Sequence, residues 1–141
     1  MAELVESQNT EYLKILVVDH HEDFLKSTES MLKQRGLIIF KATNAISALS
    51  QFELRLPDFV LLEIDLPIID GFVVLRKMKS LLKGMNHHTR ILMLTERNHV
   101  NDVKKALAEG AHDYLVKPIS RERLLEKIQK HIIHVETPKT G

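Results

Sequence analysis

Five short apolar runs, separated by amphipathic segments, constrain the fold of this chain more than any other feature of its sequence. The runs are nearly continuous rather than alternating in polarity, which is typical of parallel strands buried on both faces. They are KILVVD from Lys14, LIIFKA from Leu37, FVLLE from Phe59, RILMLT from Arg90 and HDYLVK from His112. We therefore expect five parallel β-strands.

The segments between the runs repeat apolar residues at helical spacing, which predicts amphipathic helices. Gly36, Gly84 and Gly110 follow three of these segments and are expected to end the helices. Asn44 and Ser120 are suited to begin the second and the last helix. Strict alternation of strand and helix predicts a doubly wound α/β domain with right-handed crossovers.

Length and composition limit the classes of function. A chain of 141 residues fits one domain with its own core, and a net charge of +1 without a basic stripe argues against a nucleic-acid-binding protein. There is no signal peptide and no apolar run of the ~18 residues that a membrane span needs. We expect a cytoplasmic protein without membrane contact, comprising a disordered segment 1–12, a domain 13–135 and a flexible tail 136–141.

Polar residues stand where four of the apolar runs end. Asp19 and His20 follow the first run, and Glu63, Thr95 and Lys117 mark the ends of the third, fourth and fifth. Because the functional crevice of a parallel sheet lies at the carboxyl ends of its strands, we expect these side chains to converge. The sequence DHHEDF after the first run contains no glycine, which argues against a dinucleotide or P-loop site. We therefore predict no enzymatic activity.

Four motifs occur in the order ILVVDHH, PDFVLLEIDLPIIDG, ILMLTE and GAHDYLVKP. With them the chain resembles the receiver domain of two-component response regulators, in particular the single-domain chemotaxis regulators, from about Tyr12 to Val135. The resemblance implies a flavodoxin-like five-stranded parallel sheet of order 2-1-3-4-5 with five helices. It also implies a cis peptide at Lys117-Pro118, and phosphorylation of an aspartate at the end of the third strand by a sensor histidine kinase.

The same resemblance suggests roles for individual residues. Asp19 falls on the first of two metal-site acids, Thr95 on the hydroxyl that hydrogen-bonds the phosphoryl group, and Lys117 on the lysine that pairs with it. Tyr114 falls on the aromatic whose rotation reports activation. The fourth helix, fifth strand and fifth helix would form the face that binds protein partners, either a sensor kinase or a downstream signalling protein. The sequence leaves a homodimer open.

Two departures from the family pattern affect the predicted chemistry. Pro67 fixes the register, so the phosphoacceptor position is Glu63, and His20 stands where the second metal-site acid is expected. The extra methylene would carry the Glu63 carboxylate about 1.5 Å past the place of an aspartate, and imidazole suits transition metals rather than Mg²⁺. We predict a degenerate site without efficient phosphorylation, and weak or absent Mg²⁺ binding by Asp19, Glu63 and Asp65.

Several alternatives stay open from the sequence. Glu63 is either a partial mimic of the phosphorylated state, held by Lys117, or a relic whose buried charge needs a partner; a third interpretation makes Asp65 the phosphoacceptor. The mimic predicts a largely buried Tyr114. His20 and His21 either bind a transition metal or form a pair at the start of a helix, one solvated and one hydrogen-bonded to an acid.

The predicted function is a protein-binding signalling module in a two-component phosphorelay. The alternative is an ordinary phosphorylatable response regulator, or the receiver part of a longer transcriptional regulator.

Overall fold

The computed structural model describes residues 12–34 and 36–135, and strand and helix alternate throughout them. The strands are β1 (Leu13–Val18), β2 (Leu37–Ala42), β3 (Phe59–Leu62), β4 (Arg90–Thr95) and β5 (Asp113–Val116). The helices are α1 (Glu22–Leu32), α2 (Ala45–Arg55), α3 (Gly71–Lys83), α4 (Val100–Ala108) and α5 (Arg121–Val135). Apart from Tyr12, the predicted disordered segment 1–12 lies outside the described residues, as does the predicted tail 136–141.

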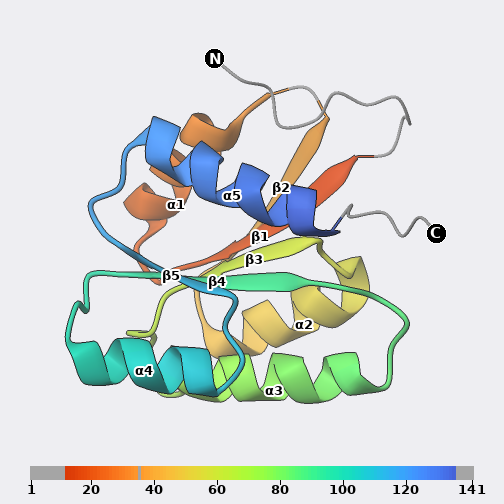
Figure 1. Cartoon of the computed structure of the whole chain (residues 1–141), viewed down its shortest axis with the longest axis vertical. Helices are drawn as coiled ribbons and strands as arrows, with labels where there is room; N and C mark the ends of the chain where they lie inside the picture. Colours follow the sequence, from red (N-terminus) through yellow and green to blue (C-terminus); the bar gives the residue numbers. More distant parts are fainter. Residues whose placement is uncertain (1–11, 35, 136–141) are drawn as a thin grey trace.

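The five strands form one parallel sheet of order β2-β1-β3-β4-β5, which confirms the predicted flavodoxin-like topology. Helices α1 and α5 cover one face of the sheet, and α2, α3 and α4 cover the other (Figure 1). Within the described residues, no helix is both long and apolar enough to cross a membrane.

The sheet separates two hydrophobic clusters, because successive side chains of a strand point to opposite faces. Ile15, Leu61 and Leu92 pack toward α1 and α5, whereas Leu16 and Val60 pack toward α2 and α3. All five of these side chains are fully buried. Burial on both faces is the physical reason why the strands read as continuous apolar runs.

Most of the predicted helix ends are confirmed. The Asn44 side chain accepts a hydrogen bond from the backbone of Ser47 and caps α2, and Ser120 accepts one from the backbone of Arg123 at the start of α5. Gly84 caps the C-terminus of α3. Gly110 follows α4 with φ +107°, a left-handed conformation that favours glycine.

The prediction that Gly36 ends the first helix is wrong. Helix α1 ends at Leu32, and the next residue, Lys33, is already extended with ψ 119°. Leu32 is the last residue of α1 that packs into the core, and a short helix depends mainly on such packing for its stability. Gly36, with φ +87°, instead precedes β2, and its carbonyl accepts a hydrogen bond from Leu13.

Candidate functional site

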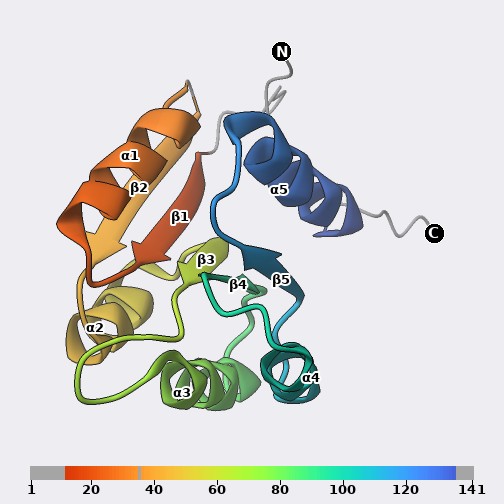
Figure 2. The same ribbon diagram turned by 90° about the vertical axis from the view of Figure 1, so that its left-hand side faces the viewer.

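The polar residues that the sequence places at the strand ends meet at the carboxyl ends of the strands, which face the viewer in Figure 2. Asp19, Glu63 and Lys117 directly follow β1, β3 and β5, and Thr95 is the last residue of β4. Because β1, β3, β4 and β5 are neighbours in the sheet, their carboxyl ends lie side by side. The predicted convergence is therefore present for these four side chains, whereas His20, which was expected to join them, is exposed.

Lys117 joins the two carboxylates. Its ammonium nitrogen lies 2.6 Å from Asp19 Oδ2 and 2.9 Å from Glu63 Oε1. The Lys117 side chain is 10% exposed, and those of Asp19 and Glu63 are 1% and 6% exposed. Burial alone would lower the pKa of Lys117, but hydrogen bonds to Asp19 and Glu63 and the charges of both outweigh it and raise that pKa. Lys117 is therefore an ammonium at neutral pH.

The second oxygen of Glu63 is also engaged. Glu63 Oε2 accepts a 2.5 Å hydrogen bond from Thr95 Oγ1 and a 2.9 Å hydrogen bond from the backbone N–H of Asp65. Thr95 is fully buried. A hydroxyl, an ammonium and a backbone amide thus converge on one carboxylate, and hydrogen bonds to an ionised acceptor are the strong class.

The loop from β3 to α3 holds Glu63 in this place through Asp70 and Gly71. Asp70 Oδ1 caps α3 by accepting hydrogen bonds from the backbone of the first residues of that helix. Gly71 packs so closely that a Cβ atom there would lie 2.2 Å from the Glu63 carbonyl oxygen and 2.7 Å from Ile64 Cα. Only glycine allows the start of α3 to approach the end of β3 this closely.

The two histidines after β1 lie at the rim of the site. His21 donates its backbone N–H to Asp19 Oδ1 at 2.9 Å, and its ring Nδ1 lies 3.3 Å from the same oxygen. His20 is exposed, and its ring is 4.1 Å from that of His21. This arrangement matches a pair at the start of α1, with one histidine solvated and the other next to an acid.

The magnesium site that the resemblance implies does not fit the residues as they are arranged. All four carboxylate oxygens of Asp19 and Glu63 accept hydrogen bonds from the protein. The Asp65 carboxylate turns away to the guanidinium of Arg97. Within residues 12–34 and 36–135, no three histidine, aspartate or glutamate side chains are grouped so as to hold a metal ion.

Sequence reasoning missed two residues of the site, Phe24 and Arg97. The ammonium of Lys117 lies 3.9 Å from the centre of the Phe24 ring, a favourable cation–π contact. Arg97 donates from Nε and Nη2 to Asp65 Oδ1 at 3.1 and 2.8 Å. One signal was present: Asp65 and Arg97 each stand two positions after a site residue, Glu63 and Thr95, and carry opposite charges.

Tyr114 is half-buried, rather than largely buried as the mimic interpretation predicts. Its ring packs against the cluster on the α3 side of the sheet, while its hydroxyl reaches the surface and donates to the Arg97 carbonyl at 2.8 Å. Burial, followed by the negative charge of Asp102, raises the pKa of Tyr114 to about 12. The phenol is therefore neutral and acts as a donor.

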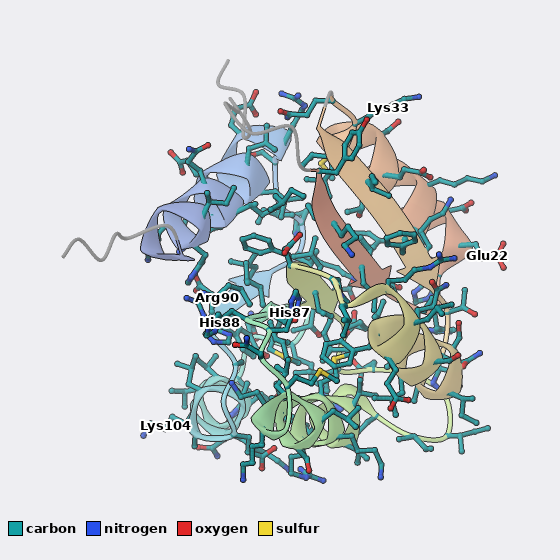
Figure 3. All side chains as sticks on the ribbon, turned by 90° about the vertical axis from the view of Figure 1, so that its right-hand side faces the viewer. Glu22, Lys33, His87, His88, Arg90 and Lys104 are labelled. Carbon is teal, nitrogen blue, oxygen red and sulfur yellow. The ribbon has the colours of Figure 1, made fainter. Side chains whose placement is uncertain are left out.

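Another pair of histidines, His87 and His88, lies at the amino ends of the strands, close to Arg90 in Figure 3. His87 Nε2 is 3.0 Å from the Pro57 carbonyl oxygen, and Thr89 donates its hydroxyl to the same oxygen at 2.7 Å. These contacts fix the loop between α3 and β4. His87 thus has a structural role there, away from the strand ends that form the site.

Comparisons with known proteins identify the family of this chain. The family model of the response regulator receiver domain matches residues 15–129. The chain belongs to the response regulator receiver family. The sheet order and the cis Lys117-Pro118 peptide, both expected from the resemblance, are confirmed by the structure of this receiver domain.

Individual relatives cover the receiver domain to different extents. The protein PilG of Pseudomonas aeruginosa is 29% identical over 127 residues, which are 89% of this chain and 91% of PilG. The transcriptional regulatory protein PrrA of Mycobacterium tuberculosis is 32% identical over 116 residues, 82% of this chain. The chain spans about half of PrrA, 48% of its length.

A solved structure supports the same relationship. The CheY-like response regulator receiver domain protein of Methanospirillum hungatei superposes with a TM-score of 0.82 and 28% identity. The match covers 90% of this chain and 98% of that one. The chain is thus a receiver domain of the two-component response regulators in both sequence and fold.

Proposed function

We propose that this receiver domain is a cytoplasmic, protein-binding signalling module of a phosphorelay, in which Glu63 takes the place of a phosphoryl group. One observation carries the proposal: the Glu63 carboxylate already accepts hydrogen bonds from Thr95 and Lys117. These are the two residues that the family resemblance assigns to the phosphoryl group.

The mimic is partial. A phosphoryl group brings nearly two negative charges and three acceptor oxygens, whereas a glutamate brings one charge and two oxygens. Coupling between two sites of a protein is typically 1–3 kcal/mol, and one carboxylate acting on Thr95 and Lys117 supplies about that much. We expect Glu63 to bias the module toward its active form rather than to fix it there.

Phosphorylation is disfavoured by the same contacts. Both oxygens of Glu63 accept hydrogen bonds, which lower their nucleophilicity, and Asp65 pairs with Arg97 at the surface. A groove leads to Lys117 between exposed acids, Glu22, Asp23 and Glu96, which repel an anionic phosphodonor. We accordingly propose no enzymatic role and only weak Mg²⁺ binding.

The proposed partner is another signalling protein, bound at the face of α4, β5 and α5. Strand β5 is at the edge of the sheet, between α4 and α5 (Figure 2). Val100 and Leu107 on α4 and Val116 on β5 are exposed apolar side chains on this face. Tyr114 links the face to the site, because its hydroxyl is bound to the loop that follows Thr95.

Incubation with a small acyl-phosphate donor and Mg²⁺, followed by intact-mass measurement, tests whether the domain can be phosphorylated. We expect no mass gain for the wild type, little for Glu63→Asp, and a clear gain for Glu63→Asp combined with His20→Asp. An ordinary receiver domain serves as the positive control. A phosphoryl group on the wild type, mapped to Glu63 or Asp65, would show that the domain is an ordinary phosphorylatable regulator.

Glu63→Gln separates the mimic from the relic, since it keeps the shape of the side chain and removes its charge. If Glu63 is a mimic, the NMR signals of the Tyr114 ring shift and binding to the partner weakens. If Glu63 is a relic, both stay unchanged while the protein is merely less stable.

A further inference from the structure

The loop between β4 and α4 has little packing of its own. Residues Glu96 to Val100 are all exposed, in contrast to β4, where Ile91 to Thr95 are all buried. An exposed loop without buried side chains relies on its polar contacts for a defined position. The position of this loop matters, because Tyr114 donates its hydroxyl to a carbonyl within it.

Arg97 makes most of those polar contacts. Its guanidinium binds Asp65 of the β3–α3 loop at 2.8 and 3.1 Å, and it reaches Asp102 of α4 at 3.4 Å. Its backbone N–H donates to Thr95 Oγ1 at 3.3 Å, and its carbonyl accepts the Tyr114 hydroxyl at 2.8 Å. Arg97 thus links its own loop to the β3–α3 loop, to the first turn of α4 and to β5.

These contacts close a ring around Glu63. Glu63 Oε2 accepts hydrogen bonds from Thr95 Oγ1 and from the backbone of Asp65. Thr95 and Asp65 both contact Arg97 in turn, through the Thr95 hydroxyl and the Asp65 carboxylate. The Asp65 side chain is 59% exposed and that of Arg97 41%, so the ion pair lies at the surface rather than inside the crevice.

We propose that Arg97 is a positioning residue: through Asp65 and Asp102 it latches the β4–α4 loop, and the latched loop holds Tyr114 against the core. The inference rests on the proposed function, because the latch matters for signalling only if Tyr114 reports the state of the module.

The size of the expected effect follows from exposure. A solvent-exposed ion pair shifts an equilibrium between two positions by at most about fivefold, and salt screens it. Removal of the Arg97 side chain leaves the backbone N–H and carbonyl in place. The acceptor of the Tyr114 hydroxyl, the Arg97 carbonyl, is therefore still present in such a variant. A change in the accessibility of Tyr114 would show that this carbonyl has moved.

The experiment uses the full chain with Tyr12→Phe, which leaves Tyr114 as the sole tyrosine in a protein without tryptophan. Acrylamide quenching of tyrosine fluorescence measures the accessibility of the Tyr114 ring. We expect the quenching constant to rise by about two- to fivefold in Arg97→Ala and in Asp65→Asn, which removes the charge of the partner. The double variant should match Arg97→Ala, because that substitution already removes the link to Asp65 together with the link to Asp102.

Salt and a second ion pair provide the controls. Raising NaCl to about 1 M should increase the quenching constant of Tyr114 in the protein that keeps Arg97 and Asp65. The quenching constant of Arg97→Ala should not change with salt. Arg76→Ala, which breaks a comparable exposed pair between Arg76 and Glu109 at 2.9 Å, should leave Tyr114 unaffected. If Arg97 had only a structural role, Arg97→Ala would lower the stability of the protein but would not alter how the quenching constant of Tyr114 depends on salt.

The outcomes for Arg97 and Glu63 are separable. If Arg97→Ala and Asp65→Asn leave Tyr114 unchanged while Glu63→Gln exposes it, the latch is wrong and the mimic stands. If the Arg97 and Asp65 effects add in the double variant, the two residues act separately and the latch is again wrong. If Arg97→Ala exposes Tyr114 and Glu63→Gln does not, the latch stands and the mimic falls.

Discussion

Replacement of Lys117 by methionine should destabilise the fold more than the loss of any surface charge. The ammonium contacts Asp19 at 2.6 Å and Glu63 at 2.9 Å, and all three side chains are at least 90% buried. Breaking a buried ion pair by removing one partner costs about 3–5 kcal/mol, because the other charge stays buried without compensation. Here two carboxylates lose their shared cation, so we expect the free energy of unfolding to fall by at least about 3 kcal/mol.

Urea unfolding, followed by far-UV circular dichroism at pH 7, measures this loss. The midpoint should fall at an unchanged slope, since the buried area stays the same. Lys41→Met is the matched control: Lys41 pairs with Glu29 at 2.7 Å, but both side chains are about 40% exposed, and the change should cost less than about 1 kcal/mol.

A second substitution tests the cause. Glu63→Gln in the Lys117→Met background removes one of the two stranded negative charges, so the double variant should be more stable than Lys117→Met alone. A loss of under about 1 kcal/mol for Lys117→Met, or a double variant less stable than the single one, would refute the argument that Lys117 neutralises this site.

The pH dependence has a defined sign. The pKa of Lys117 is raised above its ordinary value of 10.5 in the folded protein. A group with a raised pKa stabilises the fold fully below its unfolded pKa, and this contribution is lost as pH rises through the folded pKa. The difference in stability between wild type and Lys117→Met should therefore hold from neutral pH up to about 10 and shrink only above it.

Three further predictions concern the loops and Tyr114. Gly71→Ala should cost several kcal/mol in a thermal melt, because its Cβ would lie 2.2 Å from a backbone oxygen, whereas Gly84→Ala, with open space around it, should be tolerated. Asp70→Ala should lose about 1 kcal/mol of unfolding free energy with the cap of α3; an unchanged melt would contradict the cap. In the Tyr12→Phe protein, ultraviolet absorbance should show Tyr114 ionising near pH 12, and ionisation near pH 10 would contradict its burial.

The fold was predictable because one physical cause acts on the whole sequence. Strands covered on both faces must be apolar at every position, and a parallel sheet needs a helix between consecutive strands. The five runs and the amphipathic segments between them satisfy both demands, and the strand order followed from the family resemblance. The end of α1 was not predictable from Gly36, because the helix already ends at Leu32 and the glycine, with its positive φ, lies in the turn before β2.

The site was predictable to the extent that it depends on strand ends. Asp19, Glu63, Thr95 and Lys117 meet because the ends of neighbouring parallel strands meet. Contacts made by loops could not be predicted in the same way, because the spacing of apolar residues predicts strands and helices but not the conformation of a loop. The approach of Arg97 to Asp65 depends on two such loops.

The contacts that stabilise the site also disfavour phosphoryl transfer to it. Asp19 and Glu63 carry two negative charges and Lys117 one positive charge, so the cluster already has an excess of negative charge while every carboxylate oxygen accepts a hydrogen bond. An incoming phosphoryl group would add up to two further charges and would have to displace Glu63 from Thr95 and Lys117, each a charge-assisted bond of about 1.5–3 kcal/mol. In an ordinary receiver a magnesium ion would offset such charge, and here the acids that would hold it are bound to the ammonium of Lys117. On the proposed function, Lys117 both stabilises the resting site and disfavours its phosphorylation, so a variant that accepts a phosphoryl group should be less stable than the wild type.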